Sequence, residues 1–136
     1  MKFVLAGALI AATALAGCTT TQTDRSRDVK KDAGKVQIGK FYMTMSDCTA
    51  APFKLQITKQ GDNGFAMIEK SKAEIKVEDT VSGKIDASCA GQSIPAQRVV
   101  YIPNLDYVGS DTVKVYYVNE ANTEQSKEIS YSINVK

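Results

Sequence analysis

The chain has 136 residues, with 17 lysines and arginines against 15 aspartates and glutamates, no histidine and no tryptophan. This length suits one ordinary domain with a single core. The near balance of charge gives no electrostatic basis for binding nucleic acid. The lack of histidine excludes histidine-dependent catalysis and metal sites with imidazole ligands.

The N-terminus carries the first distinct pattern. Lys2 supplies a positive charge, and the thirteen residues 3–15 contain no charged side chain. Thirteen helical residues cover about 20 Å, whereas the hydrocarbon core of a bilayer is roughly 30 Å thick. We therefore expect a cleaved secretory signal and not a permanent membrane span.

Small residues and a cysteine follow this apolar run. The segment Leu15-Ala16-Gly17-Cys18 resembles the lipobox of bacterial lipoproteins at all four positions. The resemblance implies a signal peptide over 1–17, cleavage between Gly17 and Cys18, and lipid on the Cys18 thiol. Inner-membrane retention is associated with aspartate at the next position, where this chain has Thr19, so the resemblance favours the outer membrane without specifying its face. An ordinary secretory peptide with a chance cysteine is the alternative.

The stretch from Thr19 to about Val36 is polar and charged, with hardly any apolar side chain. Such a stretch cannot form a core. We expect residues 18–37 to be the lipidated cysteine and a flexible tether, and residues 38–136 to be the folded domain. The eighteen tether residues would have an r.m.s. reach of roughly 20 to 25 Å. Aspartates interleaved with its basic side chains would cancel much of any attraction to anionic headgroups.

Beyond the tether, apolar and polar residues alternate as in strands that bury one face. Phe53, Leu55 and Ile57 alternate with polar residues. The turn residues 62–64 then lead into 65–68, which predicts a hairpin. Weaker strand patterns cover 41–45, 75–81 and 98–102, and 68–76 also suits a short helix.

The clearest alternation lies near the C-terminus, over 113–118 and 129–135. Together these patterns predict six or seven short strands in about a hundred exported residues. The expected fold is therefore all-β, a small antiparallel Ig-like β-sandwich with one disulfide. A small β-barrel is the alternative.

The segment Tyr101–Val113 carries the pattern Y-x-P followed by Y-x-G-x-D. It resembles the segment that precedes the last two strands of bacterial Ig-like and cadherin-like repeats. The resemblance covers about 100–136 and implies a sandwich, but it implies no particular function. Asp111 is expected to accept bonds from nearby backbone N–H groups in a turn. Calcium binding by Asp106 and Asp111 is the alternative, and the paired acidic motifs of cadherins are absent.

Cys48 and Cys89 are the only thiols left if Cys18 carries lipid. In an exported domain such a pair predicts a disulfide. Closing this loop of 42 residues is worth roughly 4 kcal/mol in the chain-entropy model. A redox pair is the alternative, but no C-x-x-C motif is present to lower a thiol pKa.

Residues suited to catalysis are few. Ser71-Lys72 and Ser126-Lys127 are serine–lysine pairs, but adjacent residues of a strand point to opposite faces. We expect no catalytic residue, no metal ligand and no cofactor. Four tyrosines are candidates for an exposed contact surface, with at least one of the last two in the core: Tyr101, Tyr107, Tyr116 and Tyr117.

These patterns favour a non-enzymatic lipoprotein of the outer membrane. It would be attached to the membrane through its N-terminal lipid and would contact another envelope protein or surface component, with no nucleic acid involved. A ligand-binding or protease-inhibitor-like module is the first alternative, although the tryptophan-containing strand start of such inhibitors has no counterpart here. A thiol oxidoreductase is the second alternative.

Overall fold

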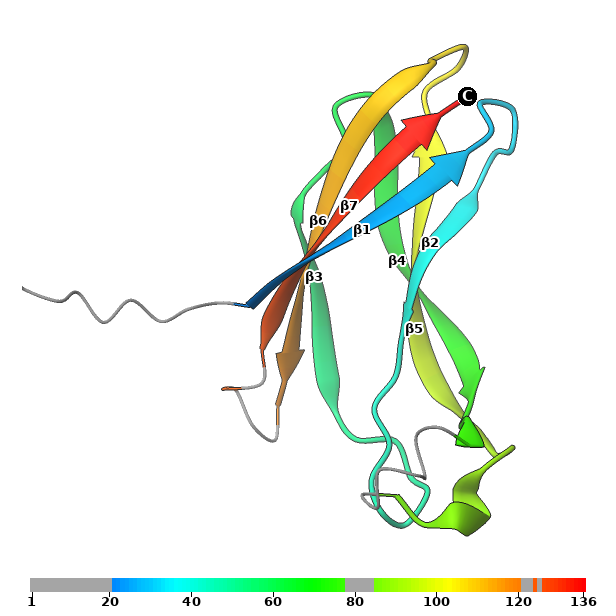
Figure 1. Cartoon of the computed structure of the whole chain (residues 1–136), viewed down its shortest axis with the longest axis vertical. Coiled ribbons are helices and arrows are strands. Elements are labelled where there is room, and N and C mark those ends of the chain that lie inside the picture. The colour runs from blue at the N-terminus through cyan, green and yellow to red at the C-terminus, as the bar shows by residue number, and fades with distance from the viewer. Residues whose placement is uncertain (1–20, 78–84, 121–123, 125) are drawn as a thin grey trace, which may run out of the picture.

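Two β-sheets pack face to face in the computed structural model, which describes residues 21–77, 85–120, 124 and 126–136 (Figure 1). The first sheet has the strand order β1-β7-β6-β3, and the second has the order β2-β5-β4. The strands are β1 (Thr21–Val29), β2 (Val36–Phe41), β3 (Phe53–Lys59), β4 (Gly64–Glu74), β5 (Ser93–Pro103), β6 (Gly109–Asn119) and β7 (Lys127–Val135). The predicted all-β sandwich is confirmed.

The strand order is that of an immunoglobulin-like domain. The orders β2-β5-β4 and β7-β6-β3 correspond to strands B-E-D and G-F-C of that fold. Strand β1 has moved to the edge of the other sheet, where it runs parallel to β7, and all other neighbours are antiparallel. We call the end marked by Thr21, Asn119 and Lys127 the root, and the end marked by Val29, Gly109 and Val135 the tip.

Strand β1 corrects the expectation of a flexible tether followed by a domain that starts at residue 38. It pairs with β7 from Thr21, opposite Lys127, to Val29, opposite Val135. Arg27 connects the two sheets, because its Nε donates to the Ile38 carbonyl at 2.8 Å. Backbone and polar bonds therefore hold a strand that has almost no apolar side chains. Residues 1–20, with the expected signal peptide and Cys18, lie outside the described residues.

The pairing also corrects the hairpin expected over 53–68. Strand β3 pairs with β6 and strand β4 pairs with β5, so residues 60–63 carry the chain from one sheet to the other. The helical alternative for 68–76 is wrong, since β4 extends to Glu74. The strand expected over 41–45 lies earlier in the chain, as β2. For the strand expected over 75–81, residues 75–77 are not in a strand, and residues 78–81 lie outside the described residues. The strands predicted within 98–102, 113–118 and 129–135 are confirmed.

The main core lies between the sheets, and two fully buried tyrosines cross it. Glycines on β2 and β4 make room for both rings. A Cβ atom on Gly39 would lie 2.0 Å from the Tyr131 hydroxyl, and one on Gly64 would lie 2.2 Å from the Tyr101 hydroxyl. A larger residue at either glycine would therefore collide with a buried side chain.

A second, smaller core surrounds the disulfide, where β4 ends and β5 begins. It contains Ala73, Ile75, Cys89, Ile94 and Ala96. The predicted Cys48–Cys89 bond is confirmed, with the two Cα atoms 5.2 Å apart. It joins the segment after β2 to the short 3-10 helix η1 (Ala87–Cys89).

Removing the disulfide should lower the free energy of unfolding by up to about 4 kcal/mol, because the unfolded chain regains its loop entropy. We expect Cys48→Ala to be nearly as destabilising as the Cys48→Ala/Cys89→Ala double variant, since each loses the same bond. Urea denaturation measures both effects, and thiol counting on the denatured, unreduced protein should find neither cysteine free. A loss below about 1 kcal/mol would show that the bond does not constrain the chain.

Candidate functional site

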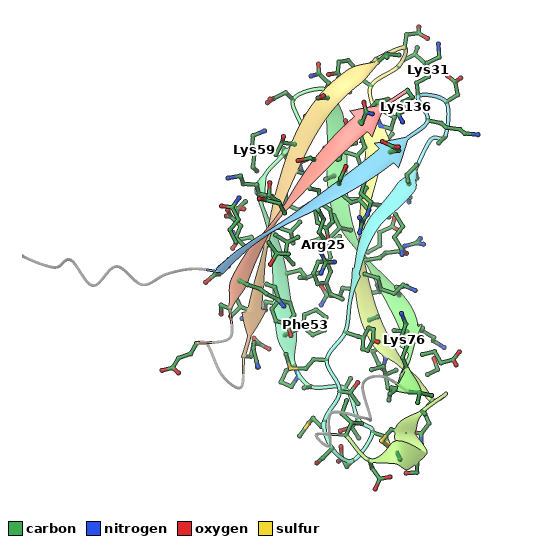
Figure 2. All side chains as sticks on the ribbon, in the orientation of Figure 1. Arg25, Lys31, Phe53, Lys59, Lys76 and Lys136 are labelled. Atoms are coloured by element: carbon green, nitrogen blue, oxygen red, sulfur yellow. A yellow bond between two sulfur atoms is a disulfide. The ribbon has the colours of Figure 1, made fainter. Side chains whose placement is uncertain are left out.

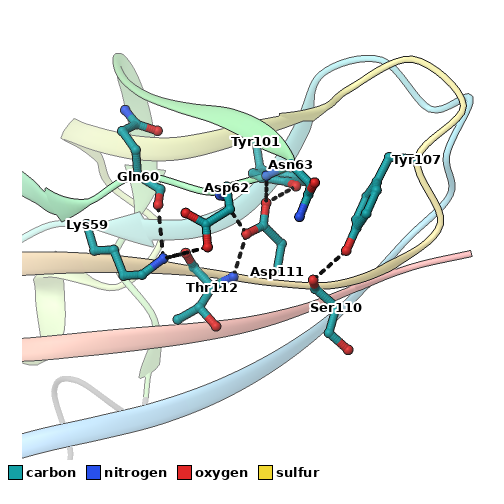
Figure 3. Close-up of polar contacts among 9 residues, drawn as sticks. All are labelled: Lys59, Gln60, Asp62, Asn63, Tyr101, Tyr107, Ser110, Asp111 and Thr112. Carbon is teal, nitrogen blue, oxygen red and sulfur yellow. Dashed lines mark hydrogen bonds and ion pairs between the residues drawn. The ribbon is translucent and has the colours of Figure 1, made fainter.

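The carboxylate of Asp111, on β6, is the most densely bonded polar group of the described residues. It is 5% exposed and accepts hydrogen bonds from the backbone N–H groups of Asp62 at 2.9 Å, Asn63 at 3.1 Å and Thr112 at 2.8 Å. The Tyr101 hydroxyl donates a fourth at 2.6 Å (Figure 3). Both carboxylate oxygens are therefore used to bind the turn after β3, as expected for a turn residue.

The calcium alternative receives no support from this arrangement. Four donors already face the Asp111 carboxylate, whereas Asp106 lies in the next turn with a positive φ of 60°. Within the described ranges, no three acidic, cysteine or histidine side chains come together as possible metal ligands. Asp111 thus serves the fold.

The electrostatics of the Tyr101–Asp111 pair keep the carboxyl charged and the phenol neutral. Burial by itself would raise the pKa of Asp111, but the hydrogen bonds from Tyr101 and from the backbone outweigh it and lower the pKa. Burial, together with the neighbouring Asp111 charge, raises the pKa of Tyr101. The bond between them is consequently charge-assisted at neutral pH.

Further hydrogen bonds hold the turns of the tip together. The backbone N–H of Asn104 donates to the Asn63 carbonyl at 2.9 Å, which joins the turn after β5 to the turn after β3. The Tyr107 hydroxyl donates to the Ser110 carbonyl at 2.6 Å and closes the second turn (Figure 3). These turns therefore form a braced end of the sandwich.

Three large apolar side chains are exposed at this braced end. Leu105 is 90% exposed, Val108 is 59% exposed and Phe65, at the start of β4, is 53% exposed. Contiguous exposed apolar surface is typical of sites that contact a partner, whereas single exposed apolar side chains are common on any protein. Met45 and Val77 are also exposed, at 48% and 63%, but they follow β2 and β4 at the other end of the sandwich. We call Phe65, Leu105 and Val108 the tip surface and take it as the candidate functional site.

Sequence reasoning missed the tip surface. Leu105 stands alone between Asn104 and Asp106, and a single apolar residue in a turn gives no periodic signal. Its position in a polar turn was the one available indication of exposure.

The expected surface of four tyrosines is wrong. Tyr101 is fully buried, and Tyr117 is 7% exposed. The Tyr117 ring stacks between Phe53, at 5.4 Å, and Phe41, at 6.2 Å between ring centroids. Tyr117 is thus the core member of the adjacent Tyr116–Tyr117 pair, and the sheet alternation predicted that one of them would be.

The two serine–lysine pairs have other contacts. The Ser71 hydroxyl donates to the Lys72 carbonyl at 3.5 Å, and the Lys127 ammonium lies 6.0 Å from the centroid of the Tyr117 ring. Over the described residues, no hydrogen bond joins either serine hydroxyl to the amine of its neighbour. Neither of these two pairs therefore places a base beside its serine hydroxyl.

Comparison with known proteins yields no relative: no family model, no curated protein and no solved structure matches the chain. Among the residues that the structure describes, no helix has the length and apolar character to cross a bilayer. The tip surface is therefore identified from its exposure and from the bonds that brace it.

Replacing Asp111 by asparagine should lower the free energy of unfolding by about 2 to 3 kcal/mol at pH 7, because an NH₂ group would face backbone donors. The native pKa of Asp111 lies below the ordinary value of 3.8, so the charge stabilises the fold fully above that pH. The stabilisation is lost as pH falls from about 4 through the native pKa. Urea denaturation at pH 7, 5 and 3 should show the difference between the proteins shrinking at pH 3.

The matched control for this variant is Asp106→Asn, in an exposed turn whose positive φ asparagine also tolerates. It should change stability little at any pH. Equal stability of Asp111→Asn and the unaltered protein at pH 7 would contradict the role of the carboxylate.

Proposed function

We propose that this protein is a bacterial lipoprotein, anchored in the outer membrane by lipid on Cys18, whose Ig-like domain is a non-enzymatic interaction module of the cell envelope. One observation carries the proposal. Strand β1 begins three residues after Cys18 and runs along the whole of β7 toward the tip, so Phe65, Leu105 and Val108 lie at the far end of that strand pair from the anchor. The other exposed large apolar side chains of the described residues, Met45 and Val77, follow β2 and β4 at the opposite end.

The length of β1 supports this orientation. Thr21 lies three positions after Cys18, so the two are at most about 11 Å apart along the chain. The nine residues of β1 then rise about 26 Å from Thr21 to Val29. The chain enters at the root and the C-terminus lies at the tip (Figure 1). A lipid on Cys18 would therefore hold the root near the bilayer and present the tip outward.

The chemistry of the tip surface supports a protein or surface partner. Burying a large apolar side chain against a partner contributes roughly 1.5 to 3 kcal/mol. Because the turn carrying Leu105 and Val108 is already held by the Asn104–Asn63 backbone bond and by the Tyr107 hydroxyl, binding would cost little ordering entropy. Two or more acyl chains at the other end would keep the protein on its membrane stably.

The anchor is tested by Cys18→Ser. The serine hydroxyl cannot form the thioether that carries diacylglycerol, so we expect lipid labelling to be abolished and the protein to leave the membrane fraction. Radiolabelled fatty acid and cell fractionation measure the two effects. A variant that still labels and sediments with membranes would show that the protein is not a lipoprotein anchored at Cys18.

The tip surface is tested by crosslinking in intact cells, with a photoreactive amino acid at Leu105. The control places it at Gln56, an exposed position on β3. We expect one discrete adduct with an envelope component from position 105 and none from position 56. The Leu105→Ser/Val108→Ser variant should melt within about 2 °C of the unaltered protein. A photoreactive amino acid at position 65 should form the adduct in the unaltered protein and should not form it in this variant. Equal adducts from both positions would contradict a partner site at the tip.

A further inference from the structure

A groove of about 650 Å³ opens between the sheets at the root, at the end opposite the tip surface. Its floor is apolar and combines Phe41, at the end of β2, and Met43, just after it, with Tyr117 and Ile129 from the other sheet. Its volume falls within the range of sites that bind small ligands. The groove is thus a distinct concave site that the tip surface does not use.

Two basic residues enter this groove from β1 and β7. In the strand register, Arg25 lies opposite Tyr131 and Lys127 lies opposite Tyr117. Because both tyrosines are buried between the sheets, strand alternation directs Arg25 and Lys127 toward the second sheet as well. Figure 2 shows Arg25 extending from β1 toward the space between the sheets. The Lys127 ammonium lies 6.0 Å from the centroid of the Tyr117 ring, beside the apolar floor.

Within the part of the chain that the structure describes, no carboxylate balances the positive charge of the groove. No aspartate or glutamate is among the described residues that line it, and neither Arg25 nor Lys127 has a carboxylate of the described chain within 4.0 Å. Lys40 also borders the groove, but its ammonium donates to the Lys72 carbonyl at 3.0 Å. Basic side chains elsewhere do form ion pairs: Lys35, Lys54, Lys59, Arg98, Lys114 and Lys136.

We propose that this groove binds the headgroup of an anionic membrane phospholipid. The phosphate would lie between Arg25 and Lys127, since guanidinium and ammonium groups both bind phosphate oxygens through charge-assisted hydrogen bonds. The first carbons of the acyl chains would contact the partly exposed side chain of Met43 at the apolar floor.

Position explains why the ligand is a membrane lipid and not free phosphate. The groove lies at the root, beside the start of β1, and it pairs an apolar floor with the cations. This step depends on the proposed anchoring at Cys18, which would keep the groove within reach of the bilayer. Bound lipid would then give the domain a second attachment and fix its orientation.

The test uses the protein as recovered from expressing cells, held in phosphatidylcholine nanodiscs. The probe is dihexanoyl phosphatidylglycerol below its micelle concentration, compared with dihexanoyl phosphatidylcholine and with glycerol phosphate. Amide chemical shifts locate binding. We expect saturable shifts at Tyr117, Lys127 and Ile129 with phosphatidylglycerol, and at least about tenfold weaker binding of the other two compounds.

Arg25→Gln/Lys127→Gln should weaken phosphatidylglycerol binding at least about tenfold. The matched control, Lys30→Gln/Lys31→Gln, removes the same charge at the tip and should bind like the unaltered protein. Lys127→Gln alone, at an exposed position, serves if Arg25→Gln fails to fold, and it should weaken binding about threefold or more.

Three results would overturn the proposal: no shifts at the groove, equal binding of phosphatidylcholine or glycerol phosphate, or undiminished binding by the groove variants. If the anchoring proposal is wrong, the measured mass of the recovered protein will lack the lipid on Cys18, whatever the groove binds. The two proposals can therefore fail independently.

Discussion

The parallel pairing of β1 with β7 is the constraint from which the functional picture follows. It converts a polar segment into an edge strand, with Val29 buried and Arg27 bonded across to Ile38. An edge strand that carries inward-pointing charges resists pairing with other chains, so the polar composition protects the sheet edge as well. Because β1 starts three residues after Cys18, the pairing also determines which end of the sandwich would lie near a lipid on that cysteine.

The two ends of the sandwich differ in chemistry because different interactions hold them. At the tip, Asp111 holds the turn after β3 through hydrogen bonds, and the Asn104–Asn63 backbone bond joins to it the turn on which Leu105 is exposed. At the root, the disulfide and its small core hold the loops, while the sheets separate enough to leave a basic, amphipathic groove. A partner surface at one end and a lipid site at the other would together suit a module that stands upright on a membrane.

Sequence reasoning succeeded where one face of a strand is apolar and failed where backbone and polar bonds decide the structure. Strand β7 alternates apolar and polar residues, most of β6 does so too, and the cysteine pair identified the disulfide. Strand β1 has the sequence TQTDRSRDV, whose stability comes from the β7 ladder that no local pattern reveals. The hairpin over 53–68 was wrong because Asp111, 48 residues beyond Asn63, binds the turn that would have closed it. The tip surface and the groove both join distant segments, so neither could be predicted locally.

Hydrogen exchange along β1 in the membrane-bound protein tests most directly whether the domain is docked at the membrane or held on a tether. Within a parallel pair, every second amide of an edge strand bonds to its neighbour. If β1 is part of the sandwich, alternate amides over Thr21–Val29 should be protected at least about a hundredfold relative to an unstructured chain. Exchange of all of these amides at the unprotected rate would contradict the docked orientation and restore the flexible tether.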